Sequence, residues 1–150
     1  MSDVHCAARL FVVSSRLSQS PVGIDQLAVL ADRLRPERIA AVHHSPDPGI
    51  AAWAVRLAAL LGVMPVRTGG LQELGTEAGL GTAIAALEGI ADGYRGEAVA
   101  VVANPQLIEL VLPRLPAKGP VELTGASYDI VELATDADGW RLVRRPERQQ

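Results

Sequence analysis

Short apolar runs and helical apolar stripes alternate along the first two thirds of the chain. The runs are typical of buried strands and predict four of them, at Leu10–Val13, Arg38–His43, Val63–Val66 and Ala98–Ala103. The stripes predict four helices, at Val22–Leu34, Ile50–Leu61, Thr82–Ala91 and Leu107–Leu115. Three further strands separated by turn signals follow, at Val121–Leu123, Tyr128–Leu133 and Trp140–Val143, with a hairpin turn at Asp136–Gly139.

This order of elements predicts an α/β fold: a three-layer sandwich with a mostly parallel sheet, helices on both faces and an antiparallel edge. We expect the strand Leu10–Val13 to lie beside the strands that end at His43 and Ala103. The helix Ile50–Leu61 is apolar nearly all round, which predicts that it is well buried. With 150 residues and no internal repeat or linker, the chain is expected to form one domain over residues 1–150, with a frayed tail at 144–150.

Charge and composition narrow the classes of function. Fourteen Lys and Arg against 17 Asp and Glu give a net charge of −3, which argues against nucleic acid as the partner. The single cysteine, Cys6, excludes a disulfide scaffold and a cysteine-based zinc site, and no spacing of other ligands suggests a metal or cofactor. No apolar run is long enough to span a membrane and the N-terminus does not resemble a secretory signal, so a cytoplasmic protein is expected.

Three predicted junctions between a strand and a helix share one pattern, a capping residue followed by proline: Ser20–Pro21, Ser45–Pro46 and Asn104–Pro105. In a parallel sheet such junctions meet at the carboxyl edge, where ligands bind with help from backbone N–H groups at helix N-termini. The candidate site residues are therefore the polar ones at this edge, namely Ser14, Ser15, Arg16, His43, His44, Glu73 and Asn104.

The segments RLFVVSSR, AAVHHSPDPGIAAWAVRLAALLGV, LQELG and GEAVAVVANPQLIELVL resemble, in this order, the landmarks of the histidine phosphatase superfamily, which has the phosphoglycerate-mutase-like fold. The resemblance runs from about Arg9 to Val143. It implies the same fold. In that family a phosphoryl group is transferred to a histidine, while two arginines and a second histidine hold the phosphate.

Position by position, the resemblance implies that this catalytic set is missing. The family's first motif, Arg-His-Gly, falls on Ser14–Arg16, its second arginine falls on Gly49, and its second histidine falls on Asn104. Glu73 alone keeps the type of the family's proton-donating carboxylate. Serine does not accept a phosphoryl group without an activating base, and a lone Arg16 does not replace a clamp of several cations.

Several alternatives remain open at the candidate site. Arg16 binds an anion, or it pairs with Glu73 and fills the site; we expect the pair, because an unpartnered carboxylate in a narrow cleft is costly. His43 and His44 are adjacent and should point to opposite faces of a strand, so only one can serve the site, and His44 is the candidate base. A Ser15–His44–Glu73 triad has the right residue types but no diagnostic spacing.

These observations favour a catalytically inactive histidine-phosphatase-like protein that acts as a binding or regulatory module. Its ligand would be an unidentified partner protein or a small anion held by Ser14, Ser15, Arg16 and Asn104. The alternative is an enzyme with altered chemistry, a hydrolase or another class, that uses Arg16, His44, Glu73 and the serines. The resemblance also implies a homodimer, because members of the family often dimerise.

Overall fold

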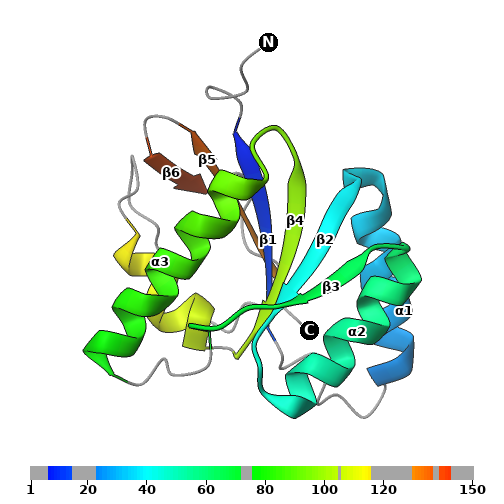
Figure 1. Cartoon of the computed structure of the whole chain (residues 1–150). Coiled ribbons are helices and arrows are strands. Elements are labelled where there is room, and N and C mark those ends of the chain that lie inside the picture. The colour runs from blue at the N-terminus through cyan, green and yellow to red at the C-terminus, as the bar shows by residue number, and fades with distance from the viewer. Residues whose placement is uncertain are drawn as a thin grey trace.

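A six-stranded sheet lies between two helical layers in the computed structural model (Figure 1). The structure describes residues 7–14, 23–71, 76–104, 106–115, 130–136 and 139–142. The sheet consists of β1 (Ala8–Ser14), β2 (Ile39–His44), β3 (Met64–Arg67), β4 (Ala98–Ala103), β5 (Ile130–Asp136) and β6 (Gly139–Leu142). Their order across the sheet is β3-β2-β4-β1-β5-β6.

The first four strands are parallel, whereas β5 and β6 form the antiparallel edge. This confirms the predicted three-layer α/β sandwich. One adjacency was wrong: β1 pairs with β4 and β5, so β2 lies one strand away on the far side of β4. The predicted turn at Asp136–Gly139 is confirmed by the pairing of these two residues between β5 and β6. The predicted strand Val121–Leu123 and the tail 144–150 lie outside the described residues.

The helices are α1 (Gly23–Leu34), α2 (Pro48–Leu61) and α3 (Glu77–Gly93). α3 begins five residues before the predicted start at Thr82, because the Thr76 hydroxyl accepts a hydrogen bond from the Gly79 N–H at 2.9 Å and caps the helix. The predicted helix Leu107–Leu115 is a π-helical turn over Leu107–Val111 followed by a 3₁₀ turn over Leu112–Arg114. Pro113 has no N–H, so a regular helical ladder cannot continue through it.

Alternating side chains of the sheet build two apolar layers. Leu10 and Val12 of β1 face the layer that contains α3 and the turns after Asn104, whereas Phe11 and Val13 face the layer that contains α1 and α2. All six residues of β4 are buried, as expected for a central parallel strand covered on both faces. No described helix is both long and apolar enough to cross a membrane.

The prediction that α2 is well buried holds for its inner face and was wrong for its outer face. The inner face packs on the sheet through Ile50, Trp53, Ala54, Leu57 and Ala58. The outer face is exposed to solvent and carries Ala52, Val55, Arg56, Ala59 and Leu60. The sequence pattern does not distinguish a helix enclosed by its own chain from one whose second face is left open.

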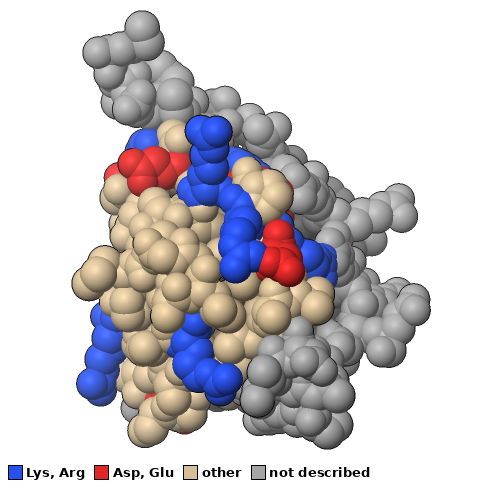
Figure 2. Space-filling model, turned by 90° about the vertical axis from the view of Figure 1, so that its right-hand side faces the viewer, with Lys and Arg blue, Asp and Glu red and all other residues tan. Residues whose placement is uncertain are grey.

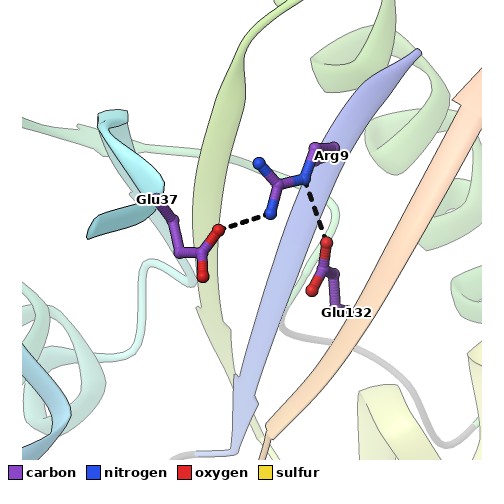
Figure 3. A network of polar contacts seen from close by, with 3 residues as sticks. All are labelled: Arg9, Glu37 and Glu132. Carbon is purple, nitrogen blue, oxygen red and sulfur yellow. Dashed lines mark hydrogen bonds and ion pairs between the residues drawn. The ribbon is translucent and has the colours of Figure 1, made fainter. Parts of the chain in front are cut away.

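An ion-pair network ties the antiparallel part of the sheet to the 3₁₀ turn Arg35–Glu37 that follows α1 (Figure 3). The Arg9 Nε donates to Glu132 Oε2 at 3.0 Å, and its Nη2 donates to Glu37 Oε1 at 2.5 Å. The Glu132 side chain is only 3% exposed, whereas that of Arg9 is 35% exposed. Burial alone would lower the pKa of Arg9, but the hydrogen bonds and charges of the two carboxylates raise it above its ordinary value.

Candidate functional site

The carboxyl ends of β2, β4 and β1 lie side by side and form the candidate site. Ser14 at the end of β1 is in register with Ala103 at the end of β4, and His44 at the end of β2 is in register with Val102. The Ser45 N–H donates to the Val102 carbonyl at 3.1 Å, which extends this alignment past the strand. The sequence prediction that these junctions meet at one edge is therefore confirmed for Ser45 and Asn104, and the candidate site residue Ser14 lies at the same edge.

The cap of α2 lies two residues further along than the sequence pattern suggested. Ser45 was predicted as the capping residue, but α2 begins at Pro48 and its cap is Asp47. The Asp47 Oδ1 accepts from the Gly49 and Ile50 N–H groups at 3.0 and 3.3 Å, while the Ser45 hydroxyl oxygen accepts from the Asp47 N–H at 3.2 Å. Asp47–Pro48 repeats the pattern of capping residue and proline, and a carboxylate is the stronger match to the helix dipole.

Asn104 makes the capping contact that its sequence predicted. Its Oδ1 accepts from the Gln106 N–H at 2.9 Å, and its carbonyl accepts from the Leu107 N–H at 2.9 Å. The side-chain oxygen of Asn104 is thus used by the turn that it begins.

His43 is held on the α3 side of the sheet by two hydroxyl groups. Its Nδ1 lies 2.8 Å from Thr68 Oγ1, and its Nε2 lies 2.9 Å from the Tyr94 hydroxyl, with the two rings edge to face. The Thr68 hydroxyl is 3.3 Å from the Val66 carbonyl, to which it donates. Because the Thr68 hydroxyl proton is donated to Val66, the Thr68 oxygen accepts from His43, and the ring proton lies on Nδ1. Nε2 then accepts the hydrogen bond from the Tyr94 O–H.

The ring of His43 is therefore best accommodated in its neutral form. Burial lowers its pKa, and the nearby charge of His44 lowers it further. The sequence did not single out Thr68 or Tyr94, which lie 25 and 51 residues away from His43 along the chain. No local signal in the sequence connects them.

His44 points to the opposite face, as the strand alternation predicted. It is 5% exposed, and its Nδ1 lies 2.9 Å from the Ser45 carbonyl. Because a carbonyl only accepts, the proton sits on Nδ1 and the lone pair on Nε2. Among the described residues, none hydrogen-bonds to that Nε2.

Ser14 and His44 are neighbours at the edge but do not share a face. By strand alternation, the buried Ser14 follows Leu10 and Val12 toward the α3 side, whereas His44 follows Val42 toward α1 and α2. A site that used both side chains would have to lie beyond the strand ends rather than on one face.

The other predicted site residues, Ser15, Arg16 and Glu73, lie outside the described residues, as does the predicted cap Ser20–Pro21. The Arg16–Glu73 pair and the triad of Ser15, His44 and Glu73 therefore stay predictions. Within the described residues, no group of three or more His, Cys, Asp and Glu side chains lies close enough together to hold a metal ion.

Comparison with known proteins supports the fold and not a specific activity. No protein-family model matches the chain, and no curated protein matches it. Among solved structures, phosphoglycerate mutase from Plasmodium falciparum is similar over 93% of this chain and 91% of its own, with a TM-score of 0.71 and 16% identity. YhfR of Bacillus stearothermophilus is similar over 95% and 98%, with a TM-score of 0.76 and 12% identity.

A mycobacterial glucosyl-3-phosphoglycerate phosphatase is similar over 94% of this chain and 99% of its own, with a TM-score of 0.65 and 15% identity. At such low identities the likeness defines the architecture and leaves the chemistry open. The chain therefore has the phosphoglycerate-mutase-like fold that the histidine phosphatase superfamily uses.

Proposed function

We propose that this protein is a binding or regulatory module of the phosphoglycerate-mutase-like fold that has lost phosphoryl-transfer chemistry. One observation supports this most directly: three polar side chains described at the carboxyl edge are hydrogen-bonded to their own turns. Ser45 accepts from the turn before α2, His44 donates to the Ser45 carbonyl, and Asn104 accepts from the turn that it begins.

The residue types at the edge support the same conclusion. The superfamily resemblance assigns its two histidines to Ser15 and Asn104, and its second arginine to Gly49. Each charge-assisted hydrogen bond to a phosphate contributes roughly 1.5–3 kcal/mol, so the loss of several removes many orders of magnitude in affinity or rate. A serine hydroxyl needs an adjacent base to become a nucleophile, and the amide of Asn104 is not a base.

An activity assay tests the loss of chemistry. The purified chain should turn over neither p-nitrophenyl phosphate nor 3-phosphoglycerate above a buffer blank between acidic and neutral pH, while an active phosphatase assayed in parallel does. Circular dichroism shows that the sample is folded. Robust turnover that disappears in a Ser15→Ala variant would show that the site still works by other means.

The nature of the ligand is tested with inorganic phosphate. A site in which Arg16 pairs with Glu73 should bind phosphate no better than about millimolar, followed by calorimetry or NMR. A Glu73→Gln variant, which frees Arg16, should bind it more tightly. Micromolar binding by the unmodified chain, weakened by Arg16→Ala, would instead identify a small anion as the physiological ligand and contradict the self-filled site.

One observation favours a second candidate, an enzyme with altered chemistry. The hydrogen bond from His44 Nδ1 to the Ser45 carbonyl fixes the tautomer that leaves a lone pair on Nε2, which is the form a general base requires. A panel of phosphate and carboxylic ester substrates distinguishes this candidate. It predicts turnover that a His44→Gln variant loses and a His43→Gln variant keeps, whereas the binding module predicts no turnover in any of the three proteins.

A further inference from the structure

Arg67 lies beside His44 at the carboxyl edge of the sheet. The two residues are in register between β3 and β2, and the Thr68 N–H donates to the His44 carbonyl at 2.9 Å just beyond this pair. Neighbouring strands lie about 4.8 Å apart, so the two side chains leave the sheet next to each other. The sequence did not single out Arg67, because nothing in it shows how β3 pairs with β2.

Both side chains point to the face of the sheet that α1 and α2 cover. The preceding pair in the register is His43 with Val66, and both of these face the α3 side. His43 is hydrogen-bonded to Tyr94, and Val66 packs against the core layer that contains α3. Side chains alternate along a strand, so the next pair, His44 and Arg67, faces the other way. Their polar atoms therefore lie on the same side, where α2 packs against β2 and β3.

Neither side chain has all of its polar atoms engaged by the part of the chain that the structure describes. His44 is more than nine-tenths buried, and its Nε2 keeps a lone pair because the ring proton is donated to the Ser45 carbonyl. This Nε2 is not one of the described side-chain atoms that are sealed from solvent without a partner, so a small molecule can reach it. Arg67 is exposed, and its guanidinium forms no hydrogen bond or ion pair with a described residue. In the free protein, water has to occupy both places, and a ligand that satisfies both groups would replace it.

The charges around this pair limit what it can bind. Asp47, which follows closely on His44, is exposed, and its Oδ1 is engaged by the N–H groups of Gly49 and Ile50. Its charge disfavours a ligand that carries two negative charges. Figure 2 shows the side of the molecule on which α1 and α2 lie. In the upper part of this view acidic and basic side chains lie together, whereas the basic side chains lower down stand apart. The described part of the site thus suits a ligand with a single negative charge.

The chemistry of the two groups specifies such a ligand. The guanidinium of arginine donates two parallel hydrogen bonds, which match the two oxygens of a carboxylate. A histidine nitrogen with a lone pair accepts a hydrogen bond from an O–H group. We propose that Arg67 and His44 bind a small carboxylic acid that has a hydroxyl group next to its carboxylate. Arg67 holds the carboxylate, and His44 Nε2 accepts from the hydroxyl.

This assignment rests on the proposed binding function and names the class of ligand. It does not depend on the phosphatase assay, because neither Arg67 nor His44 is among the positions to which the superfamily resemblance assigns catalytic residues. Failure of the ligand assignment would leave the loss of phosphoryl-transfer chemistry untouched. Turnover of a phosphate ester would contradict the proposed function without testing this pair.

Glycolate and acetate test the site, because they differ by one hydroxyl group. In an NMR titration of the ¹⁵N-labelled chain at pH 8, glycolate should bind in the millimolar range and acetate about 5-fold more weakly. The Nε2 signal of His44 should shift with glycolate and not with acetate. Arg67→Gln should weaken glycolate binding by about 10-fold or more. Arg56→Gln is the matched control, because Arg56 is also exposed but lies on the outer face of α2, and it should bind glycolate as the unmodified chain does.

A His44→Phe variant tests the acceptor, because it keeps a ring and removes the lone pair. It should bind glycolate and acetate equally, with an unchanged circular dichroism spectrum. If this buried substitution prevents folding, Arg67→Gln and the two acids still decide, because Arg67 is exposed. Equal affinity of the unmodified chain for both acids, binding of neither, or equal losses in Arg67→Gln and Arg56→Gln would overturn the proposal. Inorganic phosphate that binds through Arg67 more tightly than glycolate would also overturn it and assign the pair to phosphate.

Discussion

Arg9→Met should destabilise the fold more than any other single change in the ion-pair network. The substitution keeps the length and the apolar part of the side chain but removes the charge next to Glu132, whose side chain is 3% exposed. Breaking a buried pair by removing one partner costs about 3–5 kcal/mol. Because Arg9 itself is 35% exposed and water can reach its position, we expect the lower end, about 3 kcal/mol. The lost contact of Arg9 with the Phe11 ring, 5.2 Å away, adds about 0.5 kcal/mol.

Urea unfolding followed by circular dichroism measures this loss. For a chain of this length, 3 kcal/mol lowers the melting temperature by roughly 6–12 °C. The stability of Arg9→Lys should lie between that of the unmodified chain and that of Arg9→Met. An ammonium group keeps the charge but cannot hydrogen-bond to both carboxylates as the guanidinium of arginine does. Glu37→Gln should lower the free energy of unfolding by about 1 kcal/mol at most, since its partly exposed amide oxygen can still accept a hydrogen bond from Arg9.

The double variant Arg9→Met/Glu132→Leu provides the decisive comparison. Replacing both members of a buried pair by apolar residues is often neutral, so the double variant should recover most of the stability that Arg9→Met loses. A double variant no more stable than Arg9→Met would refute the reasoning. So would a loss below about 1 kcal/mol in Arg9→Met, which would mean that the pair behaves as a solvent-exposed one.

Two further predictions concern single side chains. Burial and the charge of His44 lower the pKa of His43 in the folded chain, so the unfolded chain binds the proton more readily. The contribution of neutral His43 to the stability is therefore complete above pH 6.5, and it is lost as the pH falls toward the folded-state pKa. Between pH 7.5 and pH 5, the urea midpoint of His43→Gln should fall less than that of the unmodified chain. An equal fall in both proteins would exclude His43 as the cause. Asp47→Ala should lower the stability by about 1 kcal/mol and Asp47→Asn by less, because asparagine still caps α2; equal losses would argue against the capping contact.

The buried parallel strands could be anticipated along the chain because burial on both faces leaves a plain apolar signal, but the expected pairing of β1 with β2 was wrong. The run at Ala98–Ala103 was predicted with the bounds that the structure has, and β1 and β2 were predicted within two residues. The first residues of the helices were harder to predict than the strands. The early start of α3 depends on one hydroxyl, that of Thr76, and the start of α2 depends on which of two adjacent proline pairs provides the cap. Such choices differ by about 1 kcal/mol, which a periodic pattern does not resolve.

Contacts between distant segments could not be predicted from the sequence, for a different reason. His43 was predicted to face away from its neighbour, and it does, but its partners Thr68 and Tyr94 come from the end of β3 and the end of α3. Strand alternation fixes the direction of a side chain without saying which loops will meet it. The same limit applies to α2, where the apolar pattern predicted a well-buried helix and the structure buries only its inner face.

The two histidines show how the surroundings of a residue, rather than its type, decide what it can do. His43 has both ring nitrogens engaged by hydroxyl groups, so its lone pair is already used and it serves the packing of α3 on the sheet. His44 has one nitrogen fixed by a backbone carbonyl and the other unengaged among the described residues. Among the described residues at the edge, His44 is therefore the side chain best placed to act as a base. Because Ser14 points to the other face, its partner in any reaction cannot be Ser14, and the predicted partner stays Ser15, which lies outside the described residues.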